Sequence, residues 1–358
     1  MAHAPHGRTT LRVVRASCPR GMSARGFTFV DVLAVIVLVV FLLALGVAAK
    51  RSAREVATYA KCLSNLKQIG TCFRVYENAN HGQYPRAVGS DPAASSAPIP
   101  VWGTPYEQHA DVGAATRPVS LFKDPPAEHA PLPNDITATM YLLVVATGLP
   151  TEVFTCPGTY LTPWDFDGAS ADRWTNWRGN DGLASHVSYS FQNMFPSRTA
   201  IGLGFAWNSA RLTSEFALAS DMSPGDAALQ VKLNDPDAQQ LAANSFNHGR
   251  QGQNVLFGDG HADWSKTVFV GVNCDNIFTA NSPGVDRPGA SPVIVASPVD
   301  ANDSILLPTA QLLGIKPPPM PEPDETSKII GAVVAGVVII IVAWILRRML
   351  KRESTPAA

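Results

Sequence analysis

Four side chains with metal-binding chemistry lie close together in the C-terminal half of the chain: His248, Asp259, His261 and Asp263. The last three alternate along the chain, and alternate residues of a strand point to one face of a sheet. Imidazole and carboxylate groups bind hard or borderline metal ions, so a metal-dependent hydrolase is one interpretation. The other, which we favour, is that Asp259-Gly260 forms a turn and the remaining side chains are solvated. No metal site is therefore predicted.

Signatures of other enzymes are missing from the sequence. It has no HExxH, P-loop or GxSxG motif, and the dinucleotide-like start at Gly202-Leu203-Gly204 has Trp207 where the third glycine belongs. No two cysteines form a CxxC pair, which leaves zinc and thioredoxin-like chemistry without support. We predict that the protein is not an enzyme and holds no cofactor.

Tryptophan side chains are further candidates for binding. Six of them are spread over the middle of the chain: Trp102, Trp164, Trp174, Trp177, Trp207 and Trp264. Such rings can form a sugar- or peptide-binding surface, although they more often anchor cores and loops.

Four of the five cysteines can form disulfides: Cys62, Cys72, Cys156 and Cys274. Four thiols in an oxidising compartment allow two disulfides in any of three pairings. Cys62 and Cys72 cannot pair on one straight helix, because ten residues separate them by about 15 Å. Buried free thiols are the alternative.

Basic residues gather at both ends of a chain whose net charge of -1 gives no reason to expect nucleic acid as a partner. Residues 1–26 contain five arginines and no acid, and residues 347–358 contain four basic residues against one glutamate. Each cluster flanks an uncharged apolar run, at 32–49 and 329–346, long enough to cover roughly 27 Å as a helix. We expect both runs to be transmembrane, with cytoplasmic ends and residues 50–328 on the outer side.

An isolated acid and a glycine frame the start of the first apolar run, in the segment RGFTFVD (25–31). A secretory signal peptide instead has a small-residue cleavage site after its apolar core. The segment resembles the start of type IV prepilins and type II secretion pseudopilins. The resemblance implies cleavage between Gly26 and Phe27 and methylation of Phe27. It also implies that Asp31 is the assembly acid, usually Glu, which pairs with the N-terminal amine of a neighbouring subunit.

A helix from about 28 to 79 is predicted, because apolar residues beyond the first run recur mostly at three- and four-residue steps. They are Tyr59, Cys62, Leu63, Leu66, Ile69, Phe73 and Tyr76. The string KCLSNLKQIGTCFRVYENANHGQYP (61–85) also resembles a large bacterial family of prepilin-like proteins of undefined function. His248 followed by Asp259-Gly260 resembles the C-terminal signature of that family, with ten intervening residues instead of nine.

Calcium is the one ligand that the resemblance leaves open. Asp165, Asp167 and Asp172 include the D-x-D-G start of a calcium loop, without its spacing or final Glu. Type II pseudopilins of related architecture can bind calcium near the C-terminal end of the domain.

The outer region reads as a helix followed by strands. Asn134 is placed to cap a helix over Ile136–Ala146, with Gly148 just beyond it. Ser185–Gln192 alternates as a half-buried strand should, and Gly258-Asp259-Gly260 turns a hairpin over 254–264. Further strands are expected at 152–157, 216–219, 229–233 and 268–272.

We therefore predict an α+β, pilin-like fold, with a long N-terminal transmembrane helix packed on an antiparallel β-sheet domain, plus a C-terminal transmembrane helix. The predicted segments are the leader (1–26), the N-terminal helix (27–80), the extracytoplasmic α+β domain (81–300), a Pro-rich linker (301–328), the C-terminal helix (329–346) and a basic tail (347–358). The C-terminal span is either a permanent anchor or a removable sorting signal of the PEP type.

The resemblance implies a structural prepilin-like or pseudopilin-like subunit, processed by prepilin peptidase and associated with a type II secretion or type IV pilus-like assembly. The implied partners are that peptidase, other pilin-like subunits, an inner-membrane assembly platform and membrane lipid. The implied location is the bacterial inner membrane, with the main domain in the periplasm. The alternative function is a membrane-anchored surface module that binds glycan or protein and uses the pilin-type signal for export.

Overall fold

A computed structural model describes residues 29–90, 98–104, 122, 131–281, 291–316, 336 and 339. The chain divides into two units, one formed by Lys50–Asp324 and the other by Met1–Ala49 together with Glu325–Ala358. The expectations for cleavage and methylation at Gly26 and Phe27 lie outside the described residues, as does the basic tail.

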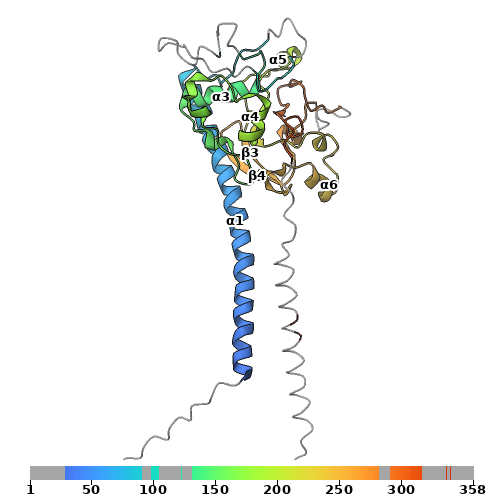
Figure 1. The fold of residues 1–358 in the computed structure, drawn as a ribbon. Coiled ribbons are helices and arrows are strands. Elements are labelled where there is room, and N and C mark those ends of the chain that lie inside the picture. Colours follow the sequence, from blue (N-terminus) through green and yellow to red (C-terminus); the bar gives the residue numbers. More distant parts are fainter. Residues whose placement is uncertain are drawn as a thin grey trace, which may run out of the picture. The chain divides into compact units, whose positions relative to one another are not determined.

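The first helix, α1, runs from Phe29 to Ala79 (Figure 1). In its second half one stripe is buried in the core of the larger unit, formed by Cys62, Leu66, Ile69, Phe73 and Tyr76. This spacing of three and four residues keeps the side chains on one face of a helix. The chain then leaves the helix through His81 and Gly82, which have the left-handed φ values of 55° and 80° that end helices.

The expectation of transmembrane helices at 32–49 and 329–346 is corrected by the structure. Among the residues that it describes, no helix combines the length and the apolar character needed to cross a membrane. The described side chains of α1 come mainly from Glu55 to Ala79, where Lys61 and Lys67 are exposed beside the buried stripe. That stretch is amphipathic and packs on its own domain. Of the C-terminal run only Gly336 and Ile339 are described, so the rest of that expectation lies outside the described residues.

A five-stranded antiparallel sheet forms the centre of the larger unit and confirms the α+β class. Its order is β4-β3-β2-β1-β7. The strands are β1 (Tyr189–Gln192), β2 (Ala217–Asp221), β3 (Gln253–Phe257), β4 (Ala262–Ser265) and β7 (Leu306–Leu307). A separate antiparallel pair joins β5 (Phe269–Gly271) to β6 (Asp275–Asn276). Residues 301–316, at the start of the predicted linker, thus supply a strand of the sheet.

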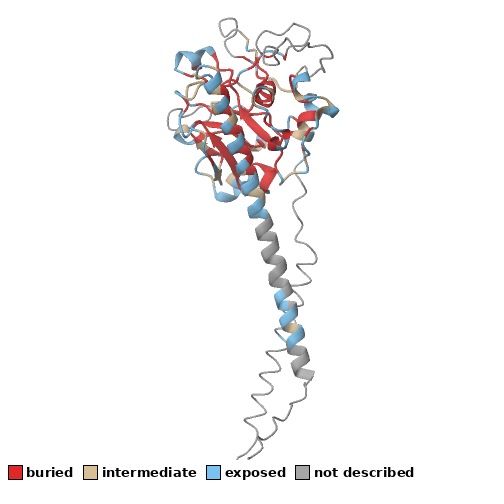
Figure 2. Ribbon diagram, turned by 90° about the vertical axis from the view of Figure 1, so that its left-hand side faces the viewer, coloured by how far each residue is buried: buried red, intermediate tan, exposed pale blue. Residues whose placement is uncertain are grey.

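The predicted half-buried strand at 185–192 is wrong in its burial, because all of β1 is buried (Figure 2). On one face the Tyr189 hydroxyl accepts a hydrogen bond from Asn65 Nδ2 of α1 at 3.2 Å. On the other face the Ser190 hydroxyl donates to the carbonyl of Pro308 at 2.6 Å. These polar side chains of β1 therefore form hydrogen bonds within the protein, to α1 and to the segment at Pro308, and not to water.

The helix α3 (Ile136–Thr147) begins at Ile136 as predicted, but its cap is Asp135 and not Asn134. Asn134 adopts a left-handed φ of 70°, and Asp135 Oδ1 accepts from the amide of Ala138 at 2.9 Å. Gly148 ends the helix with a φ of 69°, as predicted.

Short helices fill the connections, including two places where strands were predicted. Residues 152–154 lie in the 3-10 helix η1 (Thr151–Phe154) and not in a strand, and no strand covers 229–233. The remaining helices of the described ranges are η2 (Phe166–Gly168), η3 (Ala171–Arg173), α4 (Gly179–His186), α5 (Arg198–Gly202), η4 (Asp226–Ala228), α6 (Asp237–Ala242), η5 (Phe246–His248) and η6 (Val272–Cys274).

Candidate functional site

A disulfide joins α1 to the chain that follows η1. It links Cys62 to Cys156, which are 94 residues apart in sequence and have a Cα–Cα distance of 5.3 Å. Both side chains are buried. Cys72 is a half-buried free thiol and Cys274 an exposed one. The described residues therefore hold one disulfide, where the sequence allowed two.

The imidazole of His248 lies directly against this disulfide. Its Nε2 atom is 3.6 Å from Cys156 Sγ, 3.2 Å from Asp221 Oδ2 and 3.3 Å from Asn254 Nδ2. The Nδ1 atom is buried and has no hydrogen-bond partner among the described residues. The short helix η5 sets this position, because Ser245 caps its start and Gly249 ends it in the left-handed conformation.

The carboxylate of Asp221, the last residue of β2, is fully buried beside this imidazole. Its Oδ1 accepts from Asn247 Nδ2 at 3.1 Å, and its Oδ2 accepts from the Asn254 amide at 2.7 Å and from Asn254 Nδ2 at 3.1 Å. A buried carboxylate is costly unless hydrogen bonds replace its hydration, and these amides supply them.

Two half-buried aromatic rings form the outer wall of the site. Tyr59 of α1 stacks on Trp264 of β4 with ring centroids 4.7 Å apart. The ring of His248 meets Tyr59 edge-on at 4.8 Å and Trp264 at 5.4 Å. Burial, with a smaller contribution from the charge of Glu55, raises the pKa of Tyr59, which favours the neutral phenol.

These groups make one centre, which we call the disulfide–histidine centre. Its four atoms with metal-binding chemistry lie within 4.8 Å of one another and belong to Cys62, Cys156, Asp221 and His248. Among the described residues, this is the one group of histidine, cysteine and acidic side chains whose spacing could hold a metal ion. As a disulfide the two sulfurs are not thiolates, which are the form that binds metals. In this state the centre is a covalent and hydrogen-bonded junction between α1 and the sheet.

The metal cluster considered from the sequence is not assembled. His248 belongs to the disulfide–histidine centre, whereas Asp259 lies in the turn between β3 and β4 and not on a strand. The ring Nδ1 of His261 is 2.5 Å from Asp259 Oδ1, and its backbone amide donates to the same oxygen at 3.0 Å. Partial burial raises the pKa of Asp259, but the hydrogen bonds and charge of His261 outweigh it and leave the pKa below its usual value.

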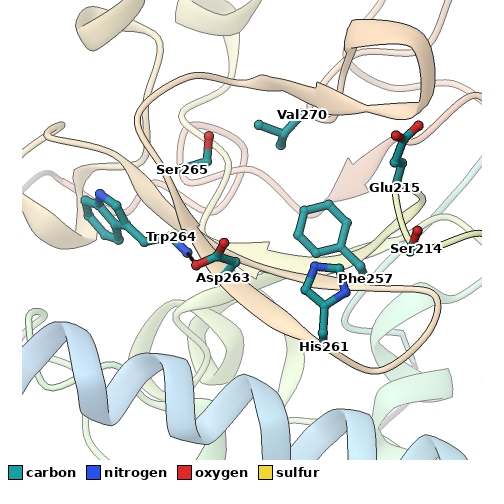
Figure 3. Close-up of a pocket in the computed structure, with 8 residues that line it drawn as sticks. All are labelled: Ser214, Glu215, Phe257, His261, Asp263, Trp264, Ser265 and Val270. Carbon is teal, nitrogen blue, oxygen red and sulfur yellow. Dashed lines mark hydrogen bonds between the residues drawn. The ribbon is translucent and has the colours of Figure 1, made fainter.

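His261 and Asp263 do line one open pocket of about 380 Å³ (Figure 3). His261 stacks on Phe257 with centroids 4.6 Å apart, and Asp263 accepts from the backbone amide of Trp264 at 2.8 Å. Each side chain thus has a local structural role. The turn at Asp259-Gly260 was predicted, and Gly260 has the φ of 88° that such a turn requires.

Each of the three acidic residues considered for calcium has its own protein partner. Asp165 accepts from the amide of Asp167, Asp167 pairs with Arg178 at 3.2 Å, and Asp172 accepts from the hydroxyl of Ser170. Four of the six tryptophans, Trp164, Trp174, Trp177 and Trp207, are buried, and Trp102 and Trp264 are half-buried. The four buried rings belong to the hydrophobic core, whereas Trp264 lines the open pocket beside His261 and Asp263.

Sequence reasoning singled out Cys62, Cys156 and His248 separately, but it did not bring them together, and it missed Asp221 and the two asparagines that bond to it. Asp221 carried one signal, because an acid ends a strand that is otherwise small and apolar (FALASDM, 216–222). For Asn247 and Asn254 the sequence has no signal that distinguishes them from ordinary polar residues.

No family model, no curated protein and no solved structure matches this chain.

Proposed function

We propose that the chain is a structural prepilin-like subunit of a type II secretion or type IV pilus-like assembly. In this proposal prepilin peptidase cuts after Gly26, and Phe27 becomes the methylated N-terminus. The observation that supports it best is α1, one helix of 51 residues whose second half is packed on an antiparallel sheet and joined to it by a disulfide. A long helix whose second half packs on a globular domain is the arrangement that the resemblance implies.

The first half of α1 offers an apolar surface for other subunits. Six of its described side chains are between 47% and 56% exposed: Val35, Ile36, Leu38, Val39, Phe41 and Leu42. A contiguous exposed apolar surface marks an interaction site. Such a surface, close to the acid Asp31, suits packing of α1 against the corresponding helices of neighbouring pilin-like subunits.

The disulfide supports an extracytoplasmic position for the folded unit, because disulfides persist in oxidising compartments. The proposed partners are prepilin peptidase, other pilin-like subunits and an inner-membrane assembly platform. The proposal assigns no catalytic residue. A glycan- or protein-binding module is the less well supported alternative, since four of the six tryptophans on which it depended are buried.

N-terminal mass spectrometry after co-expression with a prepilin peptidase tests the proposal. We expect a mature chain that starts at N-methyl-Phe27, and full loss of processing in the variant Gly26→Val. Gly21→Val, which places the same side chain five residues upstream, is the matched control and should be processed normally. A chain that keeps Met1 to Gly26, or that is cut elsewhere, contradicts the proposal.

A further inference from the structure

We propose that the disulfide–histidine centre is also a metal site, which binds one divalent cation of the zinc class when the disulfide is reduced. The four ligands are Cys62, Cys156, Asp221 and His248. This goes beyond the subunit function and does not depend on it.

His248 Nε2 already lies near two other ligand atoms at spacings that suit zinc, whereas the two sulfurs, bonded in the disulfide, separate only when it is reduced. In a tetrahedral site with Zn–S near 2.3 Å and Zn–N near 2.0 Å, ligand atoms lie about 3.3–3.8 Å from one another. The four atoms here lie within 4.8 Å of one another. His248 Nε2 is 3.6 Å from Cys156 Sγ and 3.2 Å from Asp221 Oδ2, so these three atoms need little movement.

The donor set selects the class of ion. Two thiolates, an imidazole and a carboxylate are ligands of zinc, whereas calcium and magnesium prefer oxygen ligands alone.

Charge at the centre also favours a cation. The Asp221 carboxylate is fully buried, and its partners among the described residues are Asn247, Asn254 and His248. None of these carries a permanent charge. A bound divalent ion supplies the counter-charge that a buried carboxylate otherwise lacks.

The redox step balances with a named reductant. A phosphine takes oxygen from water and becomes the phosphine oxide, and the two electrons and two protons convert the disulfide to two thiols. Each thiol then gives up its proton as the cation binds, since the thiolate is the ligand. A disulfide oxidant reverses the sequence and releases the cation.

Both states hold α1 to the same place on the domain. The disulfide joins α1 to Cys156 when the chain is oxidised, and the metal joins it to Cys156, Asp221 and His248 when the chain is reduced. The cysteines of a newly made chain are reduced in the cytoplasm. The cation would therefore link α1 to the domain first, and the disulfide would replace it after oxidation.

The test uses the full chain with Cys18, Cys72 and Cys274 replaced by serine, so that the two cysteines of the centre are the only thiols. We expect no stoichiometric zinc in the oxidised protein. After reduction with a phosphine and removal of excess ion, we expect about one zinc per chain. With cobalt(II) the reduced protein should show thiolate-to-cobalt charge transfer and the strong visible bands of a tetrahedral site.

Ligand variants make the result specific. His248→Ala and Asp221→Asn should weaken cobalt binding by more than the roughly 10–100-fold that loss of a residue hydrogen-bonded to a ligand costs. His186→Ala, at a histidine outside the centre, is the matched control and should bind normally.

Three results would overturn the inference. They are a reduced protein that takes up no stoichiometric zinc, a cobalt spectrum without thiolate bands, and unchanged affinity in both ligand variants. Should the reduced chain unfold without metal, zinc must restore its far-UV circular dichroism; failure to do so also counts against the site. None of these readouts depends on N-terminal processing, so the two proposals can fail separately.

Discussion

Asp135 shows how one carboxylate can organise a part of the domain that is otherwise apolar. It is fully buried and caps α3 through Oδ1, which accepts from the Ala138 amide. Its Oδ2 accepts from the amide and hydroxyl of Thr104 at 2.8 and 2.5 Å and from Asn176 Nδ2 at 2.9 Å. One side chain thus ties together three segments that are distant in sequence.

We expect Asp135→Ala to lower the free energy of unfolding by about 3 kcal/mol, because it removes a cap and leaves buried donors unpaired. Ser197→Ala is the matched control, since Ser197 caps α5 with a single bond to the Ala200 amide at 3.1 Å and should cost about 1 kcal/mol. Urea denaturation of the unit Lys50–Asp324 measures both. Equal losses would show that the additional bonds to Asp135 contribute nothing.

The contact between Asp259 and His261 has a pH signature. The pKa of Asp259 is lowered in the folded protein, so its stabilising contribution is present above about pH 4 and is lost as the pH falls through the folded pKa. Because both side chains are about half exposed, the effect on stability is small and is best measured by NMR titration of the carboxyl carbon.

In the variant His261→Ala we expect the pKa of Asp259 to rise toward the ordinary aspartate value of about 3.9. His186→Ala should leave it unchanged. An unaltered titration in His261→Ala would mean that the hydrogen bonds do not set this pKa.

At the scale of elements, close packing at Gly158 holds α1 near the chain that carries His248. A Cβ atom at Gly158 would lie 2.3 Å from the backbone carbonyl of Asn247 and 3.3 Å from the Thr58 methyl group of α1. Backbone cannot move aside as a flexible side chain can, so any larger residue forces the two elements apart.

We expect Gly158→Ala to destabilise the domain by about 3 kcal/mol and to shift the NMR signals of the His248 ring. Gly202→Ala is the matched control, because no atom lies within 4 Å of its added Cβ, and its effect should stay within about 1 kcal/mol. A neutral Gly158→Ala would show that this contact is looser than the structure indicates.

The sequence predicted the elements whose signals are local. The buried stripe of α1 repeats at helical spacing, Gly148 ends α3 in the left-handed conformation, and the β3–β4 hairpin turns at Asp259-Gly260. The cap of α3 was placed one residue early because Asn and Asp both suit that position, and only the backbone angles separate them.

The disulfide–histidine centre could not be predicted, because its residues come from five separate stretches of the chain. Nothing local couples Cys62 to Cys156 across 94 residues. The alternation of Asp259, His261 and Asp263 suggested a shared strand face, but the first of them lies in the turn. The burial of Ser190 likewise depends on Pro308, which returns to the sheet much later in the chain.

At the scale of the whole molecule, the second half of α1 belongs to the core of the larger unit. We expect the fragment Lys50–Asp324 to unfold cooperatively, and a fragment that starts at Asn80 to lack a cooperative transition. The shorter fragment loses the five buried apolar side chains of α1, worth about 10 kcal/mol, which is comparable to the stability of a whole domain. Thermal scans of both fragments measure this, and a cooperative transition from Asn80 onward would contradict the role assigned to α1.

The strand order β4-β3-β2-β1-β7 has a consequence for synthesis on the ribosome. Phe191 of β1 pairs with Leu307 of β7, so one edge of β1 has no partner until nearly all of the folded unit has been translated. An unpaired strand edge is a template for pairing with other chains. The nascent polypeptide therefore exposes this edge to other chains for as long as β7 is still inside the exit tunnel.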